Sequence, residues 1–161
     1  MEPKPSSFSA VDFLFLALFL GITGIAAYFG SRFPVDGWYD ALVKPPLNPP
    51  NWIFGPVWSV LYLMMAVAAW LVWRQGDKGN VAFALLLYVV QLVLNAAWSW
   101  LFFGEHKIQF ALFDIVALLL AILATIFAFS RHSRMAAAML VPYLAWVSFA
   151  TYLNFSFWRL N

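Results

Sequence analysis

Three polar side chains that could do chemistry lie within long apolar segments of this sequence. They are Asn95, Asp114 and Asn154, and each is flanked on both sides by mostly aliphatic and aromatic residues. A polar group in hydrocarbon costs several kcal/mol of free energy unless it is paired. We therefore expect all three side chains to face the interior of a helix bundle, where a neighbouring helix or a ligand can bind them.

Aromatic and small residues recur beside these groups at the spacing of one helix face, three or four residues apart. Large rings with one hydrogen-bond donor each form flat, polarisable walls, so the pattern favours a large, flat and mainly apolar ligand. The candidate ligand-binding residues on these faces are Trp58, Tyr62, Asn95, Trp98, Ser99, Trp146 and Ala150. Two other roles are equally typical of such residues: indoles anchor chains at membrane interfaces, and asparagines join helices by hydrogen bonds.

The sequence lacks the residue sets that most enzymes and metal proteins need. It has no Ser–His–acid set, no pair of carboxylates at one depth and no glycine-rich phosphate loop, so no catalytic residues are predicted. There is no cysteine, and His106 and His132 fall in short polar connectors, so no metal site is predicted either. The formal net charge of +2, with scattered basic residues, argues against nucleic-acid binding.

The composition is that of an integral membrane protein. Charged residues make up 10% of the 161 residues and hydrophobic residues 65%, with a mean hydropathy of +0.83. A soluble domain of this size carries roughly 25% charged residues, so most of the surface of this chain must face lipid. Lysine and arginine are nearly balanced between the two expected faces of the membrane, five against four, so the positive-inside rule does not assign the cytoplasmic face.

Five apolar runs are long enough to cross a bilayer, since a helical span needs about 20 residues at a rise of about 1.5 Å each. We expect an all-α membrane protein, a bundle of five transmembrane helices that forms a single domain over residues 1–161. The expected helices cover residues 11–30, 55–73, 80–103, 107–130 and 135–158. The last three connectors are so short that consecutive helices must be antiparallel neighbours. This order brings all the candidate residues into the half of the membrane nearest the first connector.

The connector between the first two helices is unusually rich in proline and tryptophan. The segment 38–62 holds five prolines and three tryptophans. Each proline lacks a backbone donor and fixes φ, so we expect extended and turn structure in this segment rather than helix. A stiff aromatic connector over the end of the bundle that holds the candidate residues predicts a cap above a ligand site.

Asp114 is an acidic residue deep inside an expected span. An ionisable residue at this depth is a functional candidate by default. The interpretation that we favour is structural, with the carboxylate held by Lys107 two turns earlier or by a neighbouring helix. The alternative is an ion or proton site in a small ion or metabolite transporter.

Three stretches of the sequence resemble the signature regions of one membrane-protein family. They are WYDALVKPPLNPPNWIFGPVWSVLY, QLVLNAAWSWLFFG and VPYLAWVSFATYLNFSFWRLN. They are similar to the TspO/MBR family, which includes translocator proteins, tryptophan-rich sensory proteins and peripheral-type benzodiazepine receptors. The resemblance implies a five-helix bundle, usually a homodimer, that binds porphyrins, sterols and benzodiazepine-type ligands beneath its first loop. It also implies that Trp38 and Tyr39 of that loop belong to the pocket.

Two positions depart from the family pattern. Leu47 stands where the family often has tryptophan, and Phe155 stands where the sterol-recognition pattern of animal members has tyrosine. Sterol or lipid binding is therefore the weakest expectation, and a tetrapyrrole such as a porphyrin or haem precursor is the ligand that we favour. We expect a receptor or translocator of a bacterial cell (inner) membrane that acts in transport, sensing or regulation, with no resident cofactor. The enzymatic alternative is light- and oxygen-dependent porphyrin degradation with Trp98 or Trp146 as the electron partner.

Overall fold

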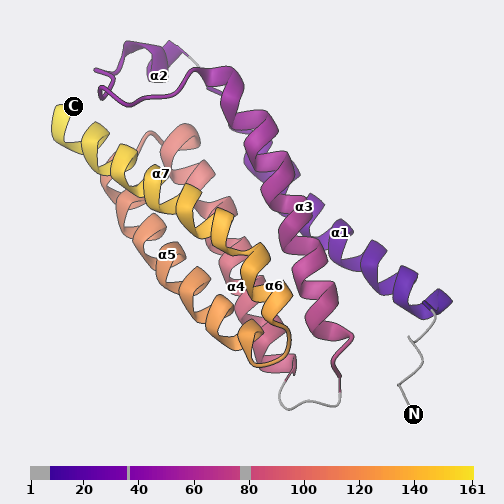
Figure 1. The fold of residues 1–161 in the computed structure, drawn as a ribbon. Coiled ribbons are helices and arrows are strands. Elements are labelled where there is room, and N and C mark those ends of the chain that lie inside the picture. The colour runs from indigo at the N-terminus through magenta and orange to yellow at the C-terminus, as the bar shows by residue number, and fades with distance from the viewer. Residues whose placement is uncertain (1–7, 36, 77–80) are drawn as a thin grey trace.

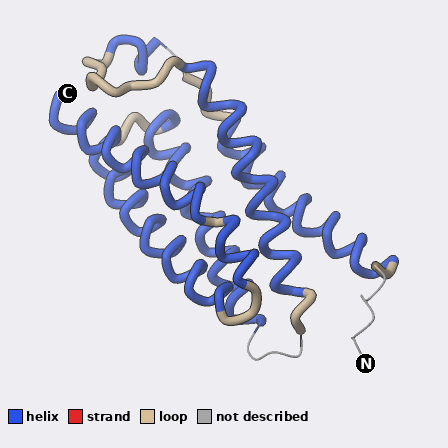
Figure 2. The backbone as a smooth tube through the Cα atoms, in the orientation of Figure 1, coloured by secondary structure: helices blue, strands red, loops and turns tan. Residues whose placement is uncertain are grey.

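All regular structure in the described part of the chain is helical (Figures 1 and 2). The computed structural model describes residues 8–35, 37–76 and 81–161. The α-helices are α1 (Ala10–Ser31), α2 (Gly37–Ala41), α3 (Phe54–Trp73), α4 (Val81–Ser99), α5 (Ile108–Ser130), α6 (Arg134–Met139) and α7 (Val141–Leu160). Two shorter elements adjoin them, a 3₁₀ turn before α3 named η1 (Asn51–Ile53) and a π-helical turn after α4 named η2 (Trp100–Gly104).

Five helical segments are long and apolar enough to cross a membrane, so the expected all-α architecture with five spans is confirmed. The segments are Ala10–Ser31, Asn51–Trp73, Val81–Gly104, Ile108–Ser130 and Arg134–Leu160. The ends of these segments fall close to the ends of the expected helices. A span requires an unbroken apolar run, and each run ends where a polar connector begins.

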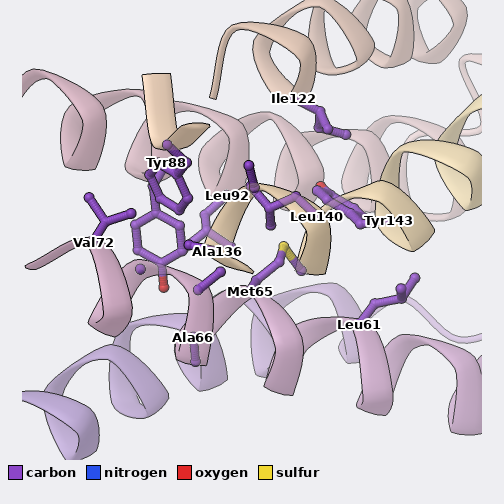
Figure 3. Packing of buried hydrophobic residues seen from close by; sticks show 14 of the residues in the cluster. Leu61, Met65, Ala66, Val72, Tyr88, Leu92, Ile122, Ala136, Leu140 and Tyr143 are labelled. Atoms are coloured by element: carbon purple, nitrogen blue, oxygen red, sulfur yellow. The ribbon is translucent and has the colours of Figure 1, made fainter. Parts of the chain in front are cut away.

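The larger cluster of buried side chains forms where α3, α4, α5, α6 and α7 meet, and a smaller cluster includes Tyr39 of α2 and Phe157 of α7. Figure 3 shows Met65, Tyr88 and Leu140 in the larger cluster, all of them buried. α4 and α5 form an extensive antiparallel pair, α7 packs on α5, and α1 packs on α3 and α4. α3 packs on α6 more than along α7, and α3 and α7 diverge toward the connector in Figure 1. This divergence separates two walls of the bundle at the end where the candidate residues lie.

The opposite end of the bundle is tied together by Asp12. Its carboxylate accepts a hydrogen bond from the Ser9 backbone N–H, and the Ser9 hydroxyl accepts one from the Asp12 N–H, which together cap the first turn of α1. The same carboxylate accepts a hydrogen bond from Nε of Arg74 at 2.9 Å, and the Asp12 carbonyl accepts one from the Trp70 indole at 2.8 Å. The start of α1 is therefore fixed on the end of α3.

Two of the expected continuous helices are interrupted near one end. The expected helix 135–158 consists of α6 and α7, because Pro142 in the first turn of α7 has no N–H to donate to the preceding turn. The expected helix 80–103 ends in the π-helical turn η2, in which the Glu105 N–H binds the Trp100 carbonyl over 2.8 Å. His106 follows with a φ of 57°, and this left-handed residue turns the chain toward α5.

The expectation that the segment 38–62 contains no helix is wrong at both of its ends. α2 forms before the first proline of KPPLNPP, where nothing prevents a helical turn. α3 begins at Phe54 and holds Pro56 in its first turn, where a missing N–H breaks no intrahelical hydrogen bond. Between these points the chain is extended or in turns, apart from η1, and Figure 2 shows this stretch at the end of the bundle.

Gly104 in η2 predicts a stability difference between two glycine-to-alanine substitutions. A Cβ atom at Gly104 would lie 2.8 Å from Cδ1 of Phe33 and 3.1 Å from Cδ1 of Trp100. A Cβ atom at Gly24 in α1 would meet nothing within 4 Å. We expect Gly104→Ala to destabilise the fold by roughly 1–3 kcal/mol through overpacking, and Gly24→Ala to be neutral or stabilising because alanine favours helix.

Thermal unfolding in detergent, followed by circular dichroism, measures both variants. Equal unfolding midpoints for Gly104→Ala and Gly24→Ala would contradict the tight packing of Phe33 on η2.

Candidate functional site

A cavity of about 580 Å³ lies between α1, α3, α4 and α7 at the end of the bundle that carries the proline-rich loop. Its volume falls within the roughly 300–1,000 Å³ typical of small-molecule pockets. Among the described residues that line it, none is charged, and most are aromatic or small. Such a cavity suits an uncharged ring system better than an ion.

Six of the predicted site residues line this cavity, and they come from three helices that are distant in the sequence. They are Trp58, Tyr62, Trp98, Ser99, Trp146 and Ala150. Binding of a ligand by these residues stays a prediction, but the structure brings them to one place.

α1 and the segment after it supply a wall that the sequence analysis did not include. Gly30 and Phe33 lie on this wall. A Cβ atom at Gly30 would come within 3.2 Å of Oγ of Ser99, so the glycine allows α1 to approach α4 closely. The four-residue spacing of Ala26 and Gly30 is a signal of close helix packing. That spacing does not indicate which helix is the neighbour. The apolar residues of this wall gave no indication in the sequence that they line a cavity.

Asn95 lies behind the cavity wall rather than on it. The Tyr62 hydroxyl donates a hydrogen bond to Oδ1 of Asn95 at 2.5 Å, and Nδ2 of Asn95 donates one to the Tyr143 hydroxyl at 3.2 Å. Asn95 and Tyr143 are buried, and Tyr62 lines the cavity. The amide therefore joins α3, α4 and α7 and fixes the direction of the Tyr62 ring.

Four of the hydrogen-bond donors around the cavity, those of Tyr62, Trp98, Trp58 and Trp146, fall into two groups. Tyr62 is paired with Asn95, and the Trp98 indole is paired with Asn154. The indole N–H groups of Trp58 and Trp146 have no hydrogen-bond partner among the described residues. Of these four donors, only the two indoles of the second group are available to a ligand without the loss of an internal bond.

Trp38 and Tyr39, which the family resemblance assigns to the pocket, do not line the 580 Å³ cavity. The Trp38 ring stacks on His106 with centroids 4.1 Å apart. Tyr39 is 2% exposed, lines a second, much smaller cavity under the loop, and donates a hydrogen bond from its hydroxyl to Oδ1 of Asn48 at 2.8 Å. Both side chains therefore hold the loop in place over the bundle.

Lys44 adds a further contact inside the loop. Its ammonium group lies 3.7 Å from the centre of the Tyr39 ring and donates a hydrogen bond to the Tyr39 carbonyl. Removal from solvent lowers the pKa of Lys44, and burial raises the pKa of the Tyr39 phenol. The phenol accordingly remains a protonated donor to Asn48 at neutral pH.

Asp114 is not held by Lys107, so that part of the structural interpretation is wrong. Nζ of Lys107 instead forms an ion pair with Glu105 at 3.1 Å, because the helix that begins at Ile108 leaves Lys107 in the connector beside it. Oδ2 of Asp114 is buried and has no hydrogen-bond partner among the described residues. Asp114 lines neither cavity, and its role as an ion or proton site stays a prediction.

Comparison with known proteins identifies one family of similar sequences. A model of the TspO/MBR family matches residues 13–159. The chain is 45% identical over 152 residues to the tryptophan-rich protein TspO of Chlorobaculum tepidum, which covers 92% of this chain and 96% of the relative. It is 42% identical over 143 residues to the translocator protein of Homo sapiens, covering 85% and 84%. It is 38% identical over 151 residues to the tryptophan-rich sensory protein of Cereibacter sphaeroides, covering 94% of each chain.

The bond between Tyr39 and Asn48 predicts how the loop responds to the loss of one oxygen atom. Tyr39→Phe removes this bond inside the loop, and a net hydrogen bond contributes about 1 kcal/mol. We expect amide hydrogen exchange in residues 41–44 to become about fivefold faster, since local opening reports such a free-energy change.

The matched control is Tyr152→Phe, which deletes the same atom from an exposed tyrosine of α7 whose hydroxyl has no partner among the described residues. If both substitutions leave exchange in the loop unchanged, the Tyr39 hydroxyl does not hold the loop.

Proposed function

The chain belongs to the TspO/MBR family, and on this basis we propose that it binds a planar tetrapyrrole, such as a porphyrin or haem precursor, in the aromatic cavity beneath its proline-rich loop. Membership of the family makes it a multi-pass integral membrane protein with a translocator or sensory role. The proposal narrows that role to one class of ligand and one site, where binding would be linked to transport, sensing or regulation.

The observation that carries the proposal is the set of aromatic rings around one uncharged cavity. Trp58 stacks on Tyr62 with ring centroids 5.4 Å apart. Trp146 lies edge-on to Phe54 at 6.0 Å, and Trp98 forms the wall on α4. Flat π-surfaces on several sides favour a flat conjugated ligand, since each ring pair contributes about 0.5–1.5 kcal/mol beyond the burial of its area.

The distribution of polar groups agrees with a ligand that is apolar in its centre and polar at its edge. The unpaired indole donors of Trp58 and Trp146 suit neutral acceptor atoms of a ligand. A carboxylate inside this cavity would lack a cationic partner, and burial of an unpaired charge is strongly unfavourable. The propionate groups of a porphyrin would therefore lie at the mouth, near the loop. Fused-ring ligands of the benzodiazepine type, with neutral acceptors, fit the same walls.

Several narrower expectations stay predictions beside this proposal. They are the homodimer, the binding of a sterol or lipid, the bacterial cell membrane as location, and light-dependent porphyrin degradation. The ion-transport alternative has less support than ligand binding, because Asp114 does not border the cavity.

Titration of protoporphyrin IX into the protein in detergent micelles tests the proposal. We expect a saturable change in porphyrin absorbance together with quenching of tryptophan emission. Trp146→Ala and Trp58→Ala should each weaken the affinity roughly tenfold, because loss of one stacked indole costs about 1.4 kcal/mol.

The control for these two variants is Trp52→Ala. Trp52 is 74% exposed in η1 and does not line the cavity, so the same deletion there should leave the affinity unchanged. An affinity that falls equally in all three variants, or in none of them, would show that the porphyrin binds elsewhere or does not bind.

A further inference from the structure

Trp98 occupies the boundary between the two cavities and contributes to the walls of both. Its ring stacks on Phe102 with centroids 5.4 Å apart and an interplanar angle of 26°, and it meets Phe103 edge-on at 5.8 Å. Two neighbours from η2 therefore confine the plane of the indole. They do not decide in which direction its N–H points, because neither phenylalanine offers a hydrogen-bond acceptor.

Asn154 decides that direction. The Trp98 indole donates a hydrogen bond to Oδ1 of Asn154 at 2.9 Å. Asn154 lies on α7, is 1% exposed, and does not line the 580 Å³ cavity. The N–H of Trp98 consequently points away from that cavity, toward Asn154 in the wall of the second, much smaller cavity.

The orientation of the Asn154 amide is fixed by a second bond. Its Nδ2 donates to the backbone carbonyl of Ile108, in the first turn of α5, at 2.9 Å. A carbonyl can only accept, so the nitrogen of the amide must face Ile108 and the oxygen must face Trp98. The first turn of α5 therefore sets the amide, and the amide sets the indole, so that α4, α5 and α7 meet at one side chain.

We propose that Asn154 is a positioning residue for ligand recognition. It keeps the Trp98 indole N–H bound to α7, so that Trp98 offers the ligand a stacking surface and no hydrogen bond. The inference rests on the proposed function of the cavity and assigns different roles to its tryptophans. Trp98 is held and stacks, whereas Trp58 and Trp146 have N–H groups without partners among the described residues and can donate to the ligand. A ligand that required an indole donor on the α4 wall would then be disfavoured.

The first arm of the test follows indole N–H signals by NMR of protein labelled with ¹⁵N-tryptophan in detergent micelles. Trp98→Phe assigns the Trp98 signal by its disappearance. In Asn154→Leu we expect the Trp98 signal to shift and its exchange with solvent to accelerate at least tenfold, whereas the signals of Trp58 and Trp146 should stay in place. An unchanged Trp98 signal would overturn the proposal.

The second arm is a double-mutant cycle on protoporphyrin IX affinity. If Asn154 acts through Trp98, Asn154→Leu should weaken binding severalfold in the wild-type background and by less than twofold in the Trp98→Phe background. If Asn154 serves only to join α7 to Ile108, the loss will be equal in both backgrounds, and the positioning role is refuted.

A third measurement needs no substitution at Asn154 and so covers the case in which Asn154→Leu does not fold. On addition of protoporphyrin IX to the wild-type protein, the indole N–H signals of Trp58 and Trp146 should move while the N–H of Trp98 stays protected from exchange. A Trp98 N–H that loses its protection or transfers to the ligand would refute the proposal. If no porphyrin binds to the wild-type protein at all, the proposed function fails, and the first arm still decides whether Asn154 orients Trp98.

Discussion

The bilayer interior offers no water to hydrogen-bond, and this constraint governs how the helices of the protein are joined. Each polar side chain inside a span must find its partner on another helix or in its own backbone. Tyr62, Asn95 and Tyr143 satisfy one another across α3, α4 and α7. Thr23 and Tyr88 do so between α1 and α4. These hydrogen bonds therefore also determine which helices are neighbours. Apolar contacts alone would leave that choice nearly undetermined, because an apolar side chain packs about as well against lipid as against another helix.

The cavity follows from the same bonds. The hydrogen bonds join α4 to α3 and to α7, and they hold the side chains of Tyr62 and Trp98 in the cavity wall. These two side chains therefore do not fill the space where α3 and α7 diverge. The loop then covers the end of the bundle through its own contacts. The side-chain amide of Asn161 accepts a hydrogen bond from the Val43 N–H at 2.9 Å and donates one to the Val43 carbonyl at 3.3 Å. The connector, fastened at the end of α7, thus lies at the end of the bundle that holds the aromatic cavity.

Asp114 departs from the rule that buried polar groups are paired. One of its carboxylate oxygens has no partner among the described residues, although a lysine lies seven residues away in the sequence. Lys107 pairs with Glu105 because both lie in the connector before α5. Lys107 is therefore outside the regular turns of α5 that would bring it next to the Asp114 carboxylate. The seven-residue spacing of Lys107 and Asp114 did not predict that they remain apart, because the start of α5 determines which side chains face one another.

The sequence by itself determined the number of spans, their antiparallel order and the end of the bundle at which the candidate residues gather. It could do so because bilayer thickness demands a fixed apolar length and short connectors permit only neighbouring helices. Tertiary structure alone decided which of those residues reach the cavity: Asn95 lies behind Tyr62, Tyr39 binds Asn48 and does not line the cavity, and α1 adds Gly30. These outcomes depend on the rotation of each helix about its axis. In a span whose lipid-facing and buried sides are both apolar, the residue pattern carries little information about that rotation, and contacts between distant parts of the chain must set it.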